Sequence, residues 1–289
     1  ETAILGNLPV AKIGEKEYYT FQEAFDACPS DGTETTVEVL RNCTTDMANI
    51  IEENKNIVLD IQSYKIVSGI ENLFTNNGKF KIVDSIGNGR IISAKGTILK
   101  NEETGNFAIN NITMQMTGSS AIDETIENKG MLEVTGGVII SDGLKNKCIN
   151  NIEQGTVKIT GGTVSAYTYA IYNTSSNKIE IEGGTVQATY YYEGYSAIYN
   201  NTENGVVEIK GGLVTNQGKA IENKKGTIKV TGGEIRTTQG DTRYSECGIY
   251  NNGKVIIEDG KVAALYRGSG IQNEGGTIEI TGGTVSAPE

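Results

Sequence analysis

Pairs of adjacent glycines recur along the C-terminal half of the chain, and their spacing constrains the fold more than any other feature. Successive pairs follow after 21 to 28 residues, and Asp259-Gly260 fills the one gap. The pairs that follow this spacing stand at positions 136/137, 161/162, 183/184, 211/212, 232/233 and 282/283. This period is typical of solenoids, in which each repeat forms one coil that stacks on the last. Weaker upstream matches continue the phase, so about ten coils can be drawn.

Two segments with alternating apolar and polar residues flank each glycine pair. In one repeat Val157 and Ile159 precede the pair, and Val164 and Ala166 follow it. A period of two indicates strands that bury one face, and glycine suits the corner between them because it adopts positive φ without steric cost. A third segment, Ile-x-Asn, completes the repeat. Three strands per coil predict an all-β fold, a single-stranded parallel β-helix whose ten coils form a rod about 50 Å long.

The asparagine of the Ile-x-Asn segment recurs at a fixed phase. We expect these side chains to form a buried ladder, each amide bonding the equivalent asparagine or the backbone of the next coil. The ladder residues are Asn128, Asn151, Asn173, Asn200, Asn223, Asn251 and Asn273. The glycosylation motif Asn-x-Ser/Thr is also matched, at Asn42, Asn111, Asn173 and Asn200. A glycan at a ladder position would have to enter the core, so we favour the structural role.

The N-terminal residues differ from the repeats. Thr20 is a suitable N-cap with Glu23 three residues on, and four apolar side chains share one helical face: Phe21, Ala24, Phe25 and Cys28. We expect a short amphipathic helix that covers the first coil, because an open solenoid end exposes unpaired strand edges. The sequence thus predicts a cap over 1–36 and a β-helix over 37–289. Since the chain stops in mid-repeat, we expect the solenoid to continue beyond Glu289 or a partner to cover its last coil.

The cysteines carry little functional signal. They stand at 28, 43, 148 and 247, form no Cys-x-x-Cys pair and have no histidine to join them, so no metal site is predicted. Cys148 takes the place of a small residue such as Ala170 in other coils, which indicates a buried thiol. Cys28 and Cys43 both fall in the cap region, and the sequence does not decide whether they form a disulfide.

Charge and composition exclude several function classes. Thirty-six acidic against 25 basic residues leave a net charge of −11, the wrong sign for binding nucleic acid or anionic lipid. No apolar run approaches the roughly 18 residues that span a bilayer, so no membrane insertion is expected. The chain contains no histidine, which removes catalytic triads that depend on imidazole.

The segments Ala11-Lys12-Ile13-Gly14 to Ala27, then 37–40 and 56–60, resemble the cap and first coils of right-handed parallel β-helices of the pectin-lyase-like superfamily. The later Ile-x-Asn and Gly-Gly-Thr-Val-Ser-Ala phrases look like those of secreted or wall-associated surface proteins of gut Firmicutes. The resemblance implies a right-handed, extracellular or cell-wall-associated bacterial protein of adhesin type. The superfamily also includes polysaccharide lyases and hydrolases, but their clustered aspartates and Ca²⁺-binding carboxylates have no match in this chain.

One corner of the repeat, after the Gly-Gly-Thr-Val-Ser-Ala strand, varies in length and is rich in tyrosine. The recurring tyrosines are Tyr167, Tyr169, Tyr190, Tyr191, Tyr192, Tyr195, Tyr244 and Tyr266. Because equal phases superimpose in a solenoid, we expect them to line one long edge. Tyrosine combines a flat apolar ring with a hydroxyl, which suits a strip that binds glycan or a surface protein. The alternative is that these rings merely pack against each other.

An enzyme remains the alternative class. The longest insertion carries Asp241, Arg243 and Glu246, with Glu193 in another variable corner. Two carboxylates could serve a glycoside hydrolase, or a base beside a cation could serve a lyase, with Ca²⁺ as cofactor only in that case. Solvated loop charges are the simpler interpretation. We therefore predict a non-enzymatic structural and adhesion module without a cofactor, with a passive spacer as a further alternative and the oligomeric state open.

Overall fold

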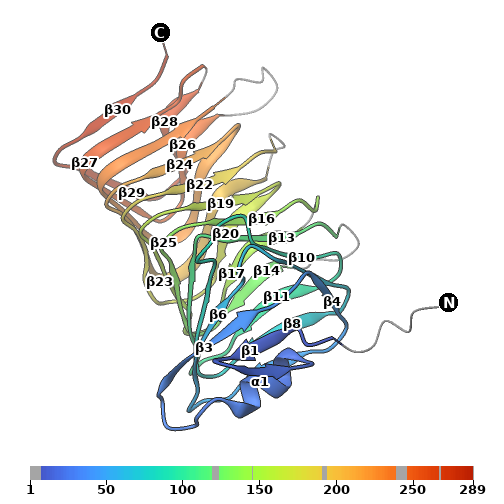
Figure 1. Ribbon diagram of the computed structural model, residues 1–289. Helices are drawn as coiled ribbons and strands as arrows, with labels where there is room; N and C mark the ends of the chain where they lie inside the picture. The colour runs from blue at the N-terminus through green and yellow to red at the C-terminus, as the bar shows by residue number, and fades with distance from the viewer. Residues whose placement is uncertain are drawn as a thin grey trace.

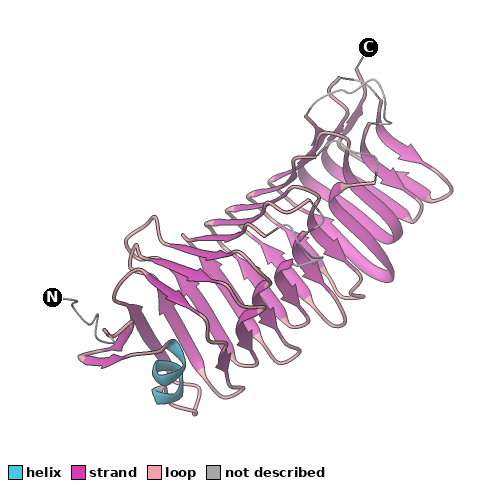
Figure 2. Ribbon diagram, turned by 90° about the vertical axis from the view of Figure 1, so that its right-hand side faces the viewer, coloured by secondary structure: helices cyan, strands magenta, loops and turns pink. Residues whose placement is uncertain are grey.

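The structure is a computed structural model, and it describes residues 8–118, 124–144, 146–190, 194–238, 246–266 and 268–288. The described chain forms a parallel β-solenoid of about ten coils with one short helix, α1 (Phe21–Ala27), near its N-terminus. The coils rise as a rod from α1 to the C-terminal strands (Figure 1), and the side view places the helix at one end (Figure 2). The predicted fold class is confirmed.

Each coil contributes strands to three parallel sheets, which we call A, B and C; the chain enters the solenoid in sheet B and then passes through C, A and B in turn. Sheet A contains β5 (Asn49–Ile51), β8 (Asn72–Asn76), β11 (Thr97–Asn101), β14 (Glu124–Asn128), β17 (Lys147–Asn151), β20 (Tyr169–Asn173), β23 (Ser196–Ile209), β25 (Lys219–Thr237), β26 (Cys247–Asn251) and β28 (Ser269–Asn273). Sheet B contains β3 (Glu34–Val39), β6 (Asn56–Asp60), β9 (Lys79–Val83), β12 (Asn106–Asn110), β15 (Met131–Val134), β18 (Thr156–Ile159), β21 (Ile179–Ile181), the continuations of β23 and β25, β27 (Lys254–Ala263) and β29 (Thr277–Ile280). Sheet C contains β4 (Cys43–Thr45), β7 (Lys65–Ser68), β10 (Arg90–Ser93), β13 (Thr113–Met116), β16 (Val138–Ser141), β19 (Thr163–Ala166), β22 (Thr185–Ala188), β24 (Leu213–Asn216), the ends of β25 and β27, and β30 (Thr284–Ser286).

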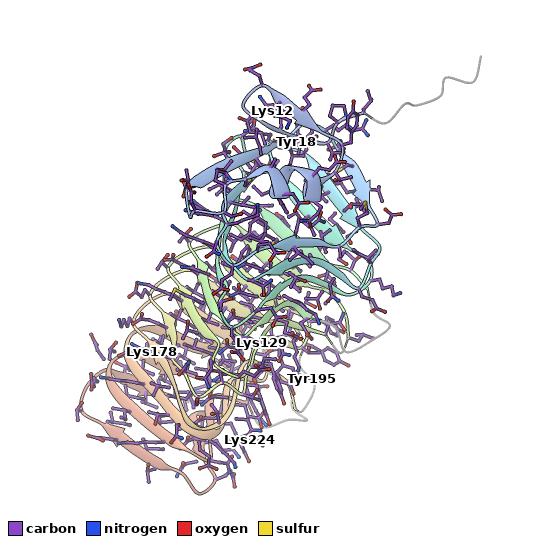
Figure 3. The ribbon with its side chains drawn as sticks, turned by 90° about the horizontal axis from the view of Figure 1, so that it is seen from below. Lys12, Tyr18, Lys129, Lys178, Tyr195 and Lys224 are labelled. Carbon is purple, nitrogen blue, oxygen red and sulfur yellow. The ribbon has the colours of Figure 1, made fainter. Side chains whose placement is uncertain are left out.

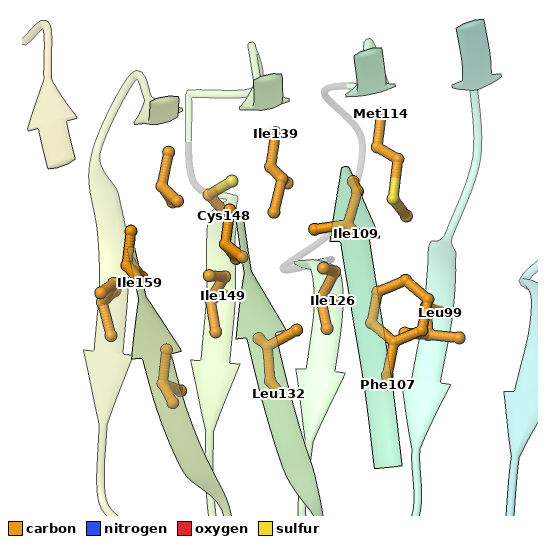
Figure 4. Packing of buried hydrophobic residues seen from close by; sticks show 14 of the residues in the cluster. Leu99, Phe107, Ile109, Met114, Ile126, Leu132, Ile139, Cys148, Ile149 and Ile159 are labelled. Atoms are coloured by element: carbon orange, nitrogen blue, oxygen red, sulfur yellow. The ribbon is translucent and has the colours of Figure 1, made fainter. Parts of the chain in front are cut away.

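Equivalent side chains of successive coils lie in register. Ile149 of β17 pairs with Ile171 of β20, which pairs with Ile198 of β23, and all three are fully buried. Figure 4 shows such apolar side chains filling the interior between the sheets. Each buried isoleucine stabilises the fold by about 1.5–3 kcal/mol. Because apolar residues alternate along each strand and stack from coil to coil, they form one continuous core.

Phenylalanines connect the cap to this core. The ring of Phe25 in α1 lies 6.2 Å from Phe74 and 5.8 Å from Phe80, measured between centroids. Phe21 extends the series on the helix, and Phe107 extends it into the solenoid. All five phenylalanines of the chain thus gather at the N-terminal end, where they seal the interior that the first coil would otherwise expose.

The helix begins and ends with satisfied backbone groups. The Thr20 hydroxyl accepts from the Glu23 amide at 3.1 Å, and the Glu23 carboxylate accepts from the Thr20 amide at 3.1 Å, which completes a capping box. At the other end, the buried Lys55 ammonium donates to the carbonyls of Asp26 and Cys28. Before the helix, β1 (Ala11–Ile13) and β2 (Lys16–Tyr18) form an antiparallel hairpin, and β1 also pairs antiparallel with β3, which follows the helix.

The two glycines of each corner have different reasons to be glycine. The second one adopts positive φ, as at Gly184 with φ +74. The first one has ordinary φ, but a Cβ on Gly183 would lie 2.4 Å from the Thr160 carbonyl oxygen of the previous coil. In the upstream corners, Ser63, Asn88 and Asn111 adopt positive φ in place of the second glycine. Short polar side chains tolerate this left-handed conformation better than other side chains do.

A buried carboxylate organises the upstream corners. Asp84 accepts hydrogen bonds from the amides of Ser63 and Ile86, at 2.8 and 3.2 Å, and from the amide of Gly89. Burial alone raises the pKa of Asp84, but these backbone hydrogen bonds outweigh it and hold the pKa below its ordinary value of 3.8.

The lowered pKa of Asp84 predicts a specific acid sensitivity. A carboxylate with a depressed folded-state pKa stabilises the fold above about pH 4, and this contribution is lost as pH falls through the folded value. We expect Asp84→Asn to melt at a lower temperature than the wild type at pH 7, with the difference shrinking between pH 4 and pH 2. Thermal melts followed by circular dichroism test this, and a difference that stays constant with pH contradicts it.

All four cysteines are free thiols, so the disulfide left open between Cys28 and Cys43 is not formed in this structure. Cys148 is fully buried and lies in register between its neighbours, opposite Ala170 of the next coil. Burial raises the pKa of the Cys148 thiol well above its ordinary range and raises that of Cys43 to about 11. These thiols therefore behave as packing groups.

Candidate functional site

The asparagines form a continuous hydrogen-bonded ladder at the end of the sheet A strands. Asn173 donates to Asn200 at 2.8 Å, and Asn200 donates to Asn223 at 2.9 Å and to the Lys225 carbonyl at 2.8 Å. Each ladder amide also bonds backbone carbonyls of its own corner or the next. The ladder begins earlier than the sequence analysis placed it, because Asn76 donates to Asn101 and Asn101 to Asn128. Its role is structural, since the side chains from Asn76 to Asn251 are buried.

Four of the eight predicted tyrosines gather at the variable corner between sheets C and A. Tyr167 and Tyr190 stack with their ring centroids 4.5 Å apart. Tyr195 lies 5.9 Å from Tyr190 and meets Tyr169 edge-on at 5.3 Å. The Tyr169 hydroxyl donates to the Gly194 carbonyl at 2.6 Å, which ties two neighbouring coils together at this corner.

Two tyrosines that the sequence analysis did not single out complete the group. Tyr172 and Tyr199 stand on the outer face of sheet A, stacked at 4.8 Å with 13° between their planes. Tyr169 contacts both edge-on, at 5.4 and 5.5 Å. We call the six residues the tyrosine cluster: Tyr167, Tyr169, Tyr172, Tyr190, Tyr195 and Tyr199. Their rings form one connected network, and each side chain is half-buried.

The other predicted site residues lie at a separate corner or outside the residues that the structure describes. Tyr266 is exposed at the corner after β27. Six others lie outside the described residues: Tyr191, Tyr192, Glu193, Asp241, Arg243 and Tyr244. Glu246 is buried, at 2% exposed, in contrast to the solvated loop charge that the sequence favoured.

The cluster continues into a row of outward-facing side chains along sheet A. Pairing of successive strands places these residues one above the other, at one position per coil. In chain order the row reads Lys100, Glu127, Asn150, Tyr172, Tyr199, Glu222, Tyr250 and Gln272. Lysines from the starts of the strands lean onto the rings: Lys147 lies 4.0 Å above Tyr172 and Lys219 lies 4.3 Å above Tyr250. The surface thus alternates aromatic rings with carboxylates and ammonium groups.

Several ionisable groups on this face have displaced pKa values. Burial, followed by the neighbouring Glu127, raises the pKa of Glu124 to about 7. Burial lowers the pKa of Lys147 despite the two glutamates beside it. Burial, with Glu222 and the surrounding tyrosines adding to it, raises the pKa of Tyr169 well above its ordinary value. Displaced pKa values of this kind often accompany binding surfaces, and here they indicate a partly dry face.

The charges of sheet B have a different character. Lys178 pairs with Glu180 and Glu208 at 2.9 and 2.5 Å, and Lys210 also pairs with Glu180. Hydrogen bonds from Lys210 and Lys178 lower the pKa of Glu180 to about 2. Figure 3 places Lys178 and Tyr195 on opposite sides of the solenoid. The sheet B charges therefore tie coils together through partly exposed and individually weak pairs, away from the tyrosine cluster.

Two hollows lie elsewhere on the described surface. One, of about 460 Å³, lies between the cap and β4, with Tyr19, Phe21 and Arg41 in its wall. The other, of about 280 Å³, lies on sheet B beside Met131 and Lys158. Neither includes a residue of the tyrosine cluster. The six cluster tyrosines come from three successive coils, an arrangement that suits an extended partner laid across the coils.

The described residues show no group of three or more histidine, cysteine, aspartate or glutamate side chains placed to hold a metal ion. Across the same residues, no helix combines the length and the apolar character needed to cross a bilayer. Comparisons of the chain with protein-family models, curated proteins and solved structures find no match. A functional proposal must therefore rest on the fold and on this surface.

Proposed function

We propose that the protein is a non-enzymatic structural and adhesion module of a bacterial cell surface, and that it binds a glycan across the tyrosine cluster. The observation that carries the proposal is the connected network of six half-buried tyrosines at one corner and on the adjoining face of sheet A. Half-buried tyrosines offer hydroxyls and ring edges on a rigid support, and little conformational entropy is lost when they bind a partner.

The mixed chemistry of the face favours a glycan over a surface protein. Asn150, Glu222, Lys147 and Lys219 stand among the rings, whereas the centres of protein interfaces are depleted of charged groups. The resemblance of the repeats to pectin-lyase-like surface proteins of gut Firmicutes supports an extracellular or wall-associated location. A surface protein as partner, a passive spacer and a polysaccharide lyase or hydrolase are the alternatives that the experiment separates.

Retention on insoluble polysaccharides tests the proposal. We expect the wild type to be retained on bacterial cell-wall glycan, pectin or alginate without releasing reducing sugar or unsaturated product, with and without Ca²⁺. Tyr190→Ala/Tyr195→Ala should weaken retention about tenfold or more, because aromatic anchors dominate such surfaces. Tyr19→Ala, an exposed tyrosine on the cap, is the matched control and should bind as the wild type does.

The alternatives give different results. Turnover of any of these polymers would show that the protein is a polysaccharide lyase or hydrolase. Binding only to a protein ligand rejects the glycan, and no binding at all supports the spacer. Equal retention of the double variant and the wild type would show that the tyrosine cluster does not bind the polysaccharide.

A further inference from the structure

The outward row of sheet A contains a buried carboxylate, Glu222, between two tyrosines. Tyr199 lies one coil before it and Tyr250 one coil after it. Adjacent coils are separated by about 4.8 Å, so the two tyrosine positions are about 9.6 Å apart. We call the space between Tyr199 and Tyr250, above the Glu222 carboxylate, the Glu222 slot.

One wall of the slot is an aromatic face that no other ring of the described residues covers. Tyr172 stacks on the face of Tyr199 that points to the preceding coil. The opposite face of Tyr199 is directed to the Glu222 position. Tyr172 differs, because Tyr199 covers one of its faces and the ammonium group of Lys147 lies over the other. Within the stacked pair, Tyr199 therefore offers its ring face to the slot.

The floor of the slot has an unsatisfied acceptor. Glu222 is only 3% exposed, and its Oε1 pairs with Lys224 at 2.8 Å and with Lys219 at 3.5 Å. Its Oε2 is buried and has no hydrogen-bond partner among the residues that the structure describes. A buried carboxylate oxygen without a donor is unfavourable because the lost solvation is not replaced. A ligand that brings a hydroxyl or another donor to Oε2 would correct this.

The slot is closed by side chains that can move. Lys219 and Lys224 lie over the ring of Tyr250, at 4.3 and 5.3 Å from its centroid. Each ammonium group sits on a flexible four-carbon chain, so the lysines can turn outward while the backbone of the coil stays in place.

We infer that the Glu222 slot binds one pyranose residue of a saccharide chain, an inference that rests on the function proposed above. Sugar hydroxyls donate to Glu222 Oε2, the apolar face of the sugar packs on Tyr199, and the two lysines turn to donate to sugar oxygens. Contacts of about 4 Å on each side of a puckered ring fill the spacing of about 9.6 Å better than a thinner aromatic group does. The slot therefore prefers a sugar ring over an aromatic side chain of a peptide.

Calorimetric titration with soluble hexasaccharides from cellulose, xylan, chitin, pectin and alginate tests this inference. We expect at least one of them to bind the wild type, and Glu222→Gln to weaken that binding about tenfold, since it removes the charged acceptor. Tyr250→Leu should weaken binding severalfold by removing the second wall without altering the carboxylate. Glu208→Gln on sheet B is the matched control and should bind as the wild type does, with circular dichroism melts showing that all variants are folded.

The outcomes separate the slot from the tyrosine cluster. If Tyr190→Ala/Tyr195→Ala weakens binding while Glu222→Gln and Tyr250→Leu bind normally, the slot is rejected and the proposed function stands. If no hexasaccharide and no insoluble polysaccharide binds the wild type, the proposed function fails and the slot fails with it. Binding of an aromatic peptide at the slot in place of sugars also overturns the inference.

Discussion

Replacing Asn200 with alanine is expected to lower the free energy of unfolding by about 3 kcal/mol. The substitution removes the acceptor of Asn173 and the donor to Asn223 in a fully buried position. Each buried polar group left without a partner costs about 1–3 kcal/mol, and the ladder spreads the defect to two coils. Urea unfolding followed by circular dichroism measures the loss.

The neighbouring Asn201 provides a matched control. It has the same side chain in the same strand, but it is half-exposed and contributes no bond to the ladder described above. Asn201→Ala should change stability by less than about 0.5 kcal/mol. Equal losses for the two variants would show that the ladder does not stabilise the solenoid.

Gly184→Ala is expected to destabilise the solenoid by about 3–4 kcal/mol, because two penalties act together. The φ of +74 is unfavourable for alanine by about 1–2 kcal/mol. The new Cβ would also lie 2.6 Å from the Gly162 carbonyl oxygen in the adjacent coil, and overpacking against fixed neighbours costs about 1–3 kcal/mol. Thermal and urea unfolding measure the sum, and a low soluble yield is the expected sign of a severe effect.

Two other glycines separate these penalties. Gly183→Ala tests crowding alone, since its φ is ordinary and its Cβ would lie 2.4 Å from a carbonyl oxygen. Gly14→Ala tests φ alone, since nothing lies within 4 Å of the added Cβ at φ +57. We expect both to be milder than Gly184→Ala. A Gly14 variant as unstable as the Gly184 variant would reject stacking between coils as the cause.

The fold was predictable because the same spacing repeats many times. Ile149, Ile171 and Ile198 recur at one phase, and stacking of coils places them in register. The ladder was harder to predict in the N-terminal coils, where the sequence repeat is less regular. Asn76 and Asn101 belong to the ladder but follow Phe and Leu rather than Ile two positions earlier, so a search for apolar-x-Asn would have found them.

The candidate site was predictable only in part. The corner tyrosines stand out by composition, but Tyr172 and Tyr199 were treated as strand residues of the Ile-Tyr-Asn phrase. Strict alternation already implies that they point outward between a buried isoleucine and a buried asparagine. The slot at Glu222 could not be derived this way, because its burial depends on where the lysine side chains of neighbouring positions come to rest.

Disulfide formation between engineered cysteines tests most directly whether residues at equivalent positions of successive coils lie one above the other. Lys158 and Glu180 are in register on adjacent coils, and Glu208 is in register one coil further on. Neighbouring parallel strands, about 4.8 Å apart, fall within the Cα separation of disulfides, whereas two coils, about 9.6 Å, exceed it. We predict that Lys158→Cys/Glu180→Cys cross-links on mild oxidation and that Lys158→Cys/Glu208→Cys does not. No cross-link in the first variant, or equal cross-linking in both, would contradict the stacked register on which the ladder, the tyrosine cluster and the slot depend.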